Sequence, residues 1–412
     1  MFNLITKLEL KRVLILAIII RVLLMPFSFH PDIKVYNFQS SFLKKGIMDI
    51  YSYIPLNKDK LSIKEEYVYF PLTYFSIGAY QIITIPLFGD DFIDWLSDAS
   101  QTANERVGVF RYLFLLKLPY LFFDLIIAFL LMSFFSNNSQ KRKVFSYWLF
   151  NPFSLVLVYV FSNIDIIPVT LTVLSLLLAL RKKITLAALL LGIAAGFKGY
   201  PLLFIPFLLL YSRSLKERIL VSFFSFGMFF IIIAPFLGSS GFREATLTSG
   251  LTTRLLTGGI NIGFGESLIL GIVSIAILFF YRLTAHNNIN TLITDYISLL
   301  LLLYSFMHFH IQWFLWILPF VVLILTIQNR LIPLFFLLGI IGFLIPFLYQ
   351  DKYMSVGLLT VISPLYNQLS LPYDVLSRIY NVNTIQGILH STFLGGSLVL
   401  INKLLKEFDH EF

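Results

Sequence analysis

Long apolar runs separated by short polar stretches dominate this chain. Most of them are close to the roughly 20 residues that an α-helix needs to cross a bilayer. The runs lie at residues 13–28, 70–88, 108–135, 144–161, 166–180, 184–211, 219–237, 262–281, 292–307, 311–328, 331–349 and 386–402. The pattern predicts an all-α polytopic membrane protein, because a membrane β-barrel would show segments of about ten residues with alternating hydrophobicity.

Short basic clusters between these runs predict the topology. The positive-inside bias favours a cytoplasmic position for the loops at 141–143, 181–183 and 213–218. All three loops can be cytoplasmic only if the 70–88 run does not cross the membrane. We therefore expect this run to be a juxtamembrane or re-entrant element within one long external segment, 29–107.

The 184–211 run must also fold back on itself. Its centre, GFKGYP, contains two glycines, a lysine and a proline, which suits a turn between two half-helices. The result is one membrane domain, 1–412, with about twelve membrane segments, both termini cytoplasmic and a second external loop at 351–385. The acidic and histidine residues then gather on the external side, so we expect any chemistry to occur there.

Composition agrees with this interpretation and removes several classes of function. The chain is 58% hydrophobic and 13% charged, whereas soluble domains are about 25% charged. We attribute the net charge of +9 to topology and anionic lipid rather than to nucleic-acid binding. The absence of cysteine excludes disulfides and thiolate chemistry. The first run follows Lys7, Lys11 and Arg12 and lacks a small-residue cleavage site, so we expect a retained helix.

Three charged residues beside the apolar runs are candidates for chemistry. Asp32 lies just past the first run, where a raised pKa would suit a general base, although a solvated or capping aspartate is the alternative. Lys198, at the expected turn, could hold a lipid phosphate or could simply extend to the interface. Asp165 could bind sugar hydroxyls or pair with Lys198, unless it only caps the helix that begins near Ile166.

Other polar residues within or near the runs suggest mainly structural roles. Lys117 and Asp124 lie two turns apart on one helix face and predict a structural polar pair. Arg21 also lies inside a run. Arg111 lies near the expected outer surface and could help to bind phosphate.

The stretch HFHIQW contains two histidines, His308 and His310, at a spacing that is poor for binding one metal ion from one helix face. We therefore predict no metal site here and keep His310 and Gln312 as contacts for sugar hydroxyls. The chain has no HExxH, Walker A, dinucleotide or serine-elbow motif, so nothing indicates ATP hydrolysis or a metalloprotease.

Four stretches together resemble the GT-C superfamily of polyprenyl-phosphate-sugar glycosyltransferases, most nearly the GPI-anchor first mannosyltransferase and its bacterial relatives. The resemblance covers most of residues 30–320 and implies a GT-C type fold with a long first external loop. The stretches are DIKVYNFQSSFLKKGIMDIYSY followed by YVYFPLTY (32–53 and 67–74), WLFNPFSLVLVYVFSNIDIIPVTLTVLSLLLALRKK (148–183), AALLLGIAAGFKGYPLLFIPFLLLY (187–211) and FHIQWFLWILPFV (309–321).

The resemblance also assigns roles. Asp32 matches the acidic residue of the family's first external loop, Lys198 the lysine before Tyr-Pro, and Asp165 the aspartate after the Asn-Pro helix. The family often has a paired Asp-x-Asp in the loop, but Lys34 occupies the second position here. Asp32 is then the sole base of the motif, and neither an essential divalent metal nor another cofactor is expected.

The implied reaction is transfer of a hexose, most nearly mannose, from a polyprenyl phosphate to a glycan or lipid acceptor, with inversion. Asp32 would take the proton of the acceptor hydroxyl. Lys198, with Arg111 or Arg254, would stabilise the departing phosphate. The residues that we assign to substrate binding are Asp165, Tyr200, His310, Gln312 and Glu66.

Two other functions stay open. A polymerase or ligase of lipid-linked polysaccharide would also have many helices and large external loops, but would transfer an oligosaccharide. A lipid-glycan flippase or transporter would have midplane charges and related halves, and neither is evident. The short loops and the Ile/Lys/Asn/Phe-rich composition favour a prokaryotic cytoplasmic membrane, with the site facing the extracytoplasmic side.

Overall fold

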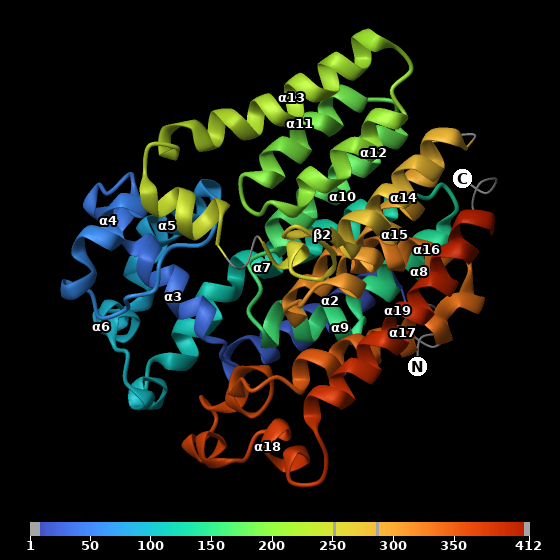
Figure 1. Ribbon diagram of the computed structural model, residues 1–412. Helices are drawn as coiled ribbons and strands as arrows, with labels where there is room; N and C mark the ends of the chain where they lie inside the picture. The colour runs from blue at the N-terminus through green and yellow to red at the C-terminus, as the bar shows by residue number, and fades with distance from the viewer. Residues whose placement is uncertain (1–8, 250–252, 286–287, 408–412) are drawn as a thin grey trace.

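The computed structural model describes residues 9–249, 253–285 and 288–407 of the 412-residue chain. Within these residues, helices form nearly all of the regular structure, and one two-stranded hairpin is the exception. In Figure 1, α3 to α6 lie on one side of the molecule, whereas α10 to α13 pack side by side at the top. The helices are α2 (Leu10–Leu24), α3 (Pro31–Ser40), α4 (Ile50–Asn57), α5 (Pro71–Phe88), α6 (Phe92–Ser97), α7 (Val109–Met132), α8 (Asn138–Leu149), α9 (Pro152–Leu155), α10 (Ile166–Leu180), α11 (Ile184–Ala195), α12 (Ile205–Leu210), α13 (Leu215–Ile233), α14 (Leu270–Thr284), α15 (Leu292–Phe306), α16 (Leu318–Ile327), α17 (Ile332–Phe347), α18 (Pro372–Ser377) and α19 (Val382–Glu407).

Several of these helices are suited to a bilayer, which makes the chain a multi-pass membrane protein. Within the described residues, four helical segments are long and apolar enough to cross a membrane, and two bent pairs raise the number to six. Six further apolar helices in this part of the chain have 10–17 residues. At about 1.5 Å per residue these are shorter than a hydrocarbon core of about 30 Å. The predicted number of about twelve membrane segments is therefore not confirmed.

The chain bends sharply before α3, and this bend positions the first candidate residue. The segments Leu10–Phe27 and Pro31–Lys45 meet at 82°. Pro31 occupies the first turn of α3, where its missing N–H costs nothing. Helix α3 therefore turns away from the axis of α2, and the external segment at 29–107 stays a prediction. Helix α5 is not among the segments suited to crossing, and its predicted juxtamembrane place stays a prediction.

The break predicted within the 184–211 run is present. Helix α11 ends at Ala195, and a 3₁₀ turn begins at Tyr200 and leads into α12. Both α11 and α12 pack against α13. The start of α5 closes the break, because the Leu72 N–H donates to the Gly196 carbonyl (3.0 Å) and the Thr73 hydroxyl to the Phe197 carbonyl (3.1 Å). Lys198 is thereby fixed beside the start of α5.

Two other predicted runs depart from simple helices. The 144–161 run divides at Asn151, and the two parts are bent by 42° with a π-helical stretch at Val156–Val160. The 262–281 run begins within an antiparallel hairpin of β1 (Gly259–Gly263) and β2 (Glu266–Ile269), and is helical only from Leu270. Positive φ angles at Gly263, Phe264 and Gly265 form the hairpin turn, which glycine favours.

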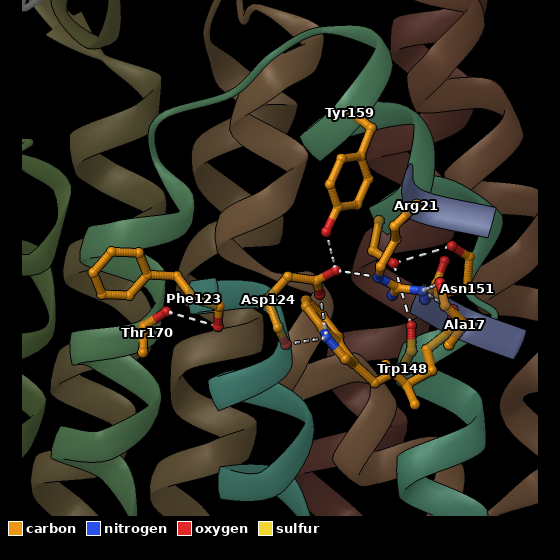
Figure 2. A network of polar contacts seen from close by, with 10 residues as sticks. Ala17, Arg21, Phe123, Asp124, Trp148, Asn151, Tyr159 and Thr170 are labelled. Atoms are coloured by element: carbon orange, nitrogen blue, oxygen red, sulfur yellow. Dashed lines mark hydrogen bonds and ion pairs between the residues drawn. The ribbon is translucent and has the colours of Figure 1, made fainter. Parts of the chain in front are cut away.

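A buried ion pair joins α2 to α7. Arg21 donates to Asp124 (Figure 2). The donor–acceptor distance is 2.6 Å, and both side chains are at most 1% exposed. The Trp148 indole and the Tyr159 hydroxyl also donate to this carboxylate, each at 2.7 Å. Four helical segments thus meet at one carboxylate, since Trp148 belongs to α8 and Tyr159 to the π-helical stretch.

The prediction that Lys117 and Asp124 pair with each other is wrong. The Lys117 ammonium donates to the carbonyls of Ser28 (2.7 Å) and Tyr159 (2.8 Å) instead. Their spacing along the helix correctly placed both residues on the face that points to the interior. Each of them, however, binds a group from another segment rather than the other residue. Lys117 ties down Ser28, which lies in the bend just before α3, so this network also positions the N-terminus of α3.

Candidate functional site

Polar residues from four interruptions of the helices converge on one place. His30 and Asp32 lie at the start of α3, and Asp165 lies at the start of α10. Lys198 lies in the break after α11, and the pair His310 and Gln312 begins the 3₁₀ turn Ile311–Trp316. Helix ends leave backbone N–H groups without helical partners, so side chains that satisfy these groups gather there.

Two histidines cap their helices in the same way. The backbone N–H of Asp32 donates to His30 Nδ1, and that of Gln312 donates to His310 Nδ1, both at 3.3 Å. The two rings meet edge to face with centroids 5.6 Å apart. A ring nitrogen that accepts carries no proton, so these caps require the tautomer protonated at Nε2. The Gln312 amide in turn donates to the Phe161 carbonyl at 3.2 Å, and its presence near Asp32 favours the charged form of that carboxylate.

His30 brings a second feature to the site. Its ring is buried, and its Nε2 has no hydrogen-bond partner among the described residues.

Burial, aided by His30 and Lys198, lowers the pKa of His310 to about 3. The His310 imidazole is therefore neutral at pH 7, as its capping role requires.

The Asp32 carboxylate is ionised at neutral pH. Burial alone raises its pKa, but the positive charge that the His30 and His310 imidazoles carry when protonated, the Lys198 ammonium and the Gln312 amide together lower the pKa below its ordinary value. The raised pKa expected from the sequence is therefore wrong, because the surrounding polar groups outweigh burial. The side chain is still 40% exposed, so a ligand can reach it.

Lys198 and Asp165 form the opposite part of the cluster. The Lys198 ammonium lies 3.8 Å from Asp165 Oδ1 and 4.6 Å from the centre of the Tyr69 ring. The Asp165 side chain is 4% exposed and accepts a hydrogen bond from the Trp316 indole at 2.8 Å. It does not cap α10. Asn163 instead accepts the Asp165 backbone N–H at 2.9 Å, so the capping alternative for Asp165 is not realised.

Lys198 keeps its hydrogen-bonding capacity. Charge-assisted hydrogen bonds from an ammonium are about 2.7–2.9 Å long, and the 3.8 Å separation from Asp165 is well outside that range. Among the described residues no hydrogen bond from its Nζ is found, and the side chain is 26% exposed. An anionic group could therefore take its protons. Burial and the nearby Asp32 and Asp165 raise the pKa of Tyr69, so its phenol stays protonated and can donate as well.

Aromatic rings flank the charged cluster. Trp316 stacks on Tyr200 with centroids 4.2 Å apart, and on Trp313 at 5.2 Å. Arg254 lies over the Trp313 ring at 5.5 Å and donates to the His308 carbonyl at 3.4 Å. Arg254 is therefore at the edge of the cluster, where its charge reaches His310.

Two sequence candidates lie elsewhere. Arg111 is exposed at the start of α7, over the Tyr112 ring and against Gly89. Glu66 lies 3.9 Å from Lys58, and both side chains are about half exposed. The structure does not bring either candidate to Asp32, and their assigned roles stay predictions.

Lys34, at the position where the related motif has a second acid, also points elsewhere. It donates to the Asp98 carbonyl and lies 5.1 Å from the Trp95 ring. Residues two apart on a helix do not share a face, so position 34 is not directed toward the cluster. Within the described ranges no group of three or more histidine or acidic side chains could hold a metal ion.

Sequence reasoning missed several members of the site. His30, Tyr69, Asn163 and Trp316 were not among the candidates. One signal was available for His30, because His-x-Asp at 30–32 and His-x-Gln at 310–312 repeat the same capping spacing. Tyr69 and Trp316 act through partners that are distant in the sequence, whereas Asn163 binds the backbone N–H of Asp165, two positions further along.

The comparison with known families gives one match. Residues 96–257 match the family model described as GPI transamidase subunit PIG-U. This segment is similar to a membrane protein family of the GPI pathway, and that family is not described as a glycosyltransferase. The match spans less than half of the chain and includes Asp165 and Lys198, but not Asp32, His310 or Gln312. Among curated proteins no match is found.

Proposed function

We propose that this protein is a membrane glycosyltransferase that moves a hexose, most nearly mannose, from a polyprenyl phosphate to a glycan or lipid acceptor on the extracytoplasmic face. The observation that carries the proposal is the juxtaposition of two accessible groups of opposite charge. The Asp32 carboxylate is ionised and partly exposed, and the Lys198 ammonium, whose charge acts on it, has no hydrogen bond to a described residue.

The two groups suit the two ends of a displacement reaction. Asp32 accepts the proton of the acceptor hydroxyl while that oxygen forms a bond to the anomeric carbon. The bond between the anomeric carbon and the phosphate oxygen breaks, and the lipid phosphate leaves with the electron pair. Lys198 donates to this anion as its charge grows. A single displacement inverts the anomeric centre, and the step needs no external oxidant or reductant.

The surrounding residues hold these groups in place. Asp165 keeps Lys198 beside the site without taking its protons, and the Trp316 indole satisfies the buried Asp165 oxygen. The His30 cap holds the backbone at Asp32, and the Phe161 carbonyl holds the Gln312 amide. The protonated Tyr69 supplies a donor for a sugar hydroxyl or a phosphate oxygen.

Sugar transfer by the purified protein in detergent tests this proposal, because a flippase or transporter has no measurable activity without two compartments. Labelled polyprenyl-phosphate mannose serves as donor, and the product is identified by mass spectrometry. Asp32→Asn should reduce transfer by about 10²–10⁴-fold, the range for loss of a general base. The exposed external carboxylate of Asp94 offers a matched control, and Asp94→Asn should transfer normally. Undiminished transfer by Asp32→Asn would refute the mechanism.

A non-catalytic, lipid-binding role is the second candidate. The match to a GPI transamidase subunit favours it, because the matched segment contains Asp165 and Lys198 but lacks the proposed base. This role predicts that Lys198→Met weakens binding of a polyprenyl-phosphate sugar, whereas Asp32→Asn leaves binding unchanged and wild-type protein shows no transfer. Measurement of binding and transfer on the same preparation separates the two functions.

A further inference from the structure

A cavity lies next to the charged cluster and is separate from it. Its volume is about 540 Å³, which falls within the range of about 300–1,000 Å³ of small-molecule sites. Four separate stretches of the chain form its walls. The lining residues belong to the start of α3 (29–35), the extended stretch 62–65, the turn 98–104 and the second external loop (353–367).

The lining is rich in uncharged hydrogen-bonding groups. Hydroxyls come from serine and threonine residues, amides come from Asn104 and Asn367, and Tyr353 supplies an aromatic ring. The Asn104 Oδ1 is buried and has no hydrogen-bond partner among the described residues, while its amide nitrogen makes one long contact of 3.4 Å with Thr360. Buried polar atoms rarely stay unpaired, so Asn104 offers an acceptor to a ligand.

The charges of the cavity are balanced or already engaged. Lys34 donates to the Asp98 carbonyl, and the Asp98 carboxylate pairs with Arg106 at 2.8 Å. Lys64 and Glu65, the other charged lining residues, are exposed and of opposite sign. A phosphate or carboxylate would find no unpaired cationic cluster here. A neutral molecule with many hydroxyls fits the mixture of donors, acceptors and aromatic rings.

The cavity and the charged cluster share a wall. Phe29 and Pro31 line the cavity, whereas the residues next to them, His30 and Asp32, belong to the cluster. Tyr353 lines the cavity, and its ring lies 6.3 Å from that of His30. A ligand in the cavity would therefore lie one side-chain layer from Asp32.

The second external loop is fastened over the cavity. The Phe29 backbone N–H donates to the Leu358 carbonyl at 2.9 Å, and the Lys352 ammonium donates to the Asn367 side chain at 3.0 Å. The first contact ties the loop to the start of α3. The second sets the direction of an amide that faces the cavity. The loop is thus preorganised, and a ligand would not have to order it.

We propose that this cavity binds a short, neutral glycan and that this glycan is the acceptor. The acceptor role rests on the proposed glycosyltransferase function, but binding of a neutral glycan does not. The Asn104 amide and the neighbouring hydroxyls hold sugar hydroxyls, and Tyr353 packs on a sugar face. The bound glycan presents its terminal hydroxyl past Pro31 to the carboxylate of Asp32.

Binding of mannotriose to the full-length protein in detergent, measured by titration calorimetry, tests this proposal. Asn104→Leu and Tyr353→Leu should each raise the Kd by about five- to tenfold, because each removes one hydrogen bond or one packing surface. Gln368→Leu is the matched control, since Gln368 is an exposed amide of the same loop that does not line the cavity. It should bind as the wild type does. Thr360→Val provides a milder variant, expected to weaken binding about threefold, and thermal unfolding checks that every variant is folded.

The outcomes separate this inference from the proposed function. If Asp32→Asn abolishes transfer and binds mannotriose normally, both stand. Saturable binding that depends on Asn104 in a protein without transfer would refute the transferase and leave the glycan site. Transfer with no change of Kd or acceptor KM in folded Asn104→Leu and Tyr353→Leu would overturn the cavity assignment alone. Binding only of a phosphorylated mannose would overturn the assignment to a neutral ligand.

Discussion

The pair formed by Arg21 and Asp124 predicts a large and specific stability effect. Arg21→Met removes the cation but leaves Asp124 1% exposed in a low-dielectric interior. The carboxylate then keeps only the Trp148 and Tyr159 donors, each at 2.7 Å. Loss of one partner of a buried ion pair typically costs about 3–5 kcal/mol, and we expect this range for Arg21→Met and for Asp124→Leu.

The double variant provides the stronger test of the same network. With both charges removed, the Tyr159 hydroxyl loses its acceptor at a cost of about 1–3 kcal/mol, whereas the Trp148 indole still donates to the backbone carbonyl of residue 124 at 3.1 Å. The two single variants should together cost about 6–10 kcal/mol, so the double variant of Arg21 and Asp124 should be less destabilised than their sum by at least about 3 kcal/mol.

The assay is the free energy of unfolding in mixed micelles, from SDS titration of the purified protein. Arg181→Met is the control, because Arg181 is exposed and makes only a 3.3 Å contact with the Ser133 carbonyl. It should change stability by no more than about 0.5 kcal/mol. Costs for Arg21→Met below about 1 kcal/mol, or single-variant costs that simply add, would show that the pair is not a coupled buried network.

Three further predictions concern the candidate site and its surroundings. The pKa of Asp32 is lowered, and its deprotonated form is the proposed base. The transfer rate should therefore stay level as pH falls from 7 to about 5 and decline only near or below about pH 4. A pH–rate profile with a midpoint near 6 would contradict this prediction. Hydrogen bonds from Ser100 lower the pKa of Asp98 to about 2, so its stabilising effect is present above about pH 4 and is lost as pH falls toward 2. Asp98→Asn should flatten the dependence of unfolding on pH over that interval. Trp316→Phe removes the 2.8 Å hydrogen bond to Asp165 and should raise the KM for the donor several-fold with little change in kcat, whereas an unchanged KM would show that the indole does not position Lys198 through Asp165.

Local features of the sequence predicted the parts of the site that depend on local backbone. Glycine and proline around Lys198 are strong signals for a helix break, and the structure has the break between Ala195 and Tyr200. Charges within apolar runs are costly and therefore informative. This reasoning selected both Asp165 and Lys198, and their side chains lie 3.8 Å apart.

Partners across long sequence separations were not predictable in this way. Arg21 and Asp124 are 103 positions apart, and helical periodicity gives only the face on which each lies. The same limit applies to Lys117, which was assigned to Asp124 because both lie on one face. The prediction of a raised pKa for Asp32 failed for a related reason. A position near the membrane predicts burial of the carboxylate but not the polar groups that surround it.

The location of the cluster at interruptions of helices has a physical basis. Within a helix in a membrane the backbone groups are satisfied, and a polar side chain there has few partners. At an interruption, backbone N–H groups need acceptors, and the side chains of His30 and His310 supply them. Each cap fixes the backbone of the residue that it binds, Asp32 or Gln312. The backbone in turn sets the direction in which that side chain extends. A site made from several such caps can be rigid without a surrounding β-sheet, and its geometry depends more on the capping histidines than on the apolar helices that carry them.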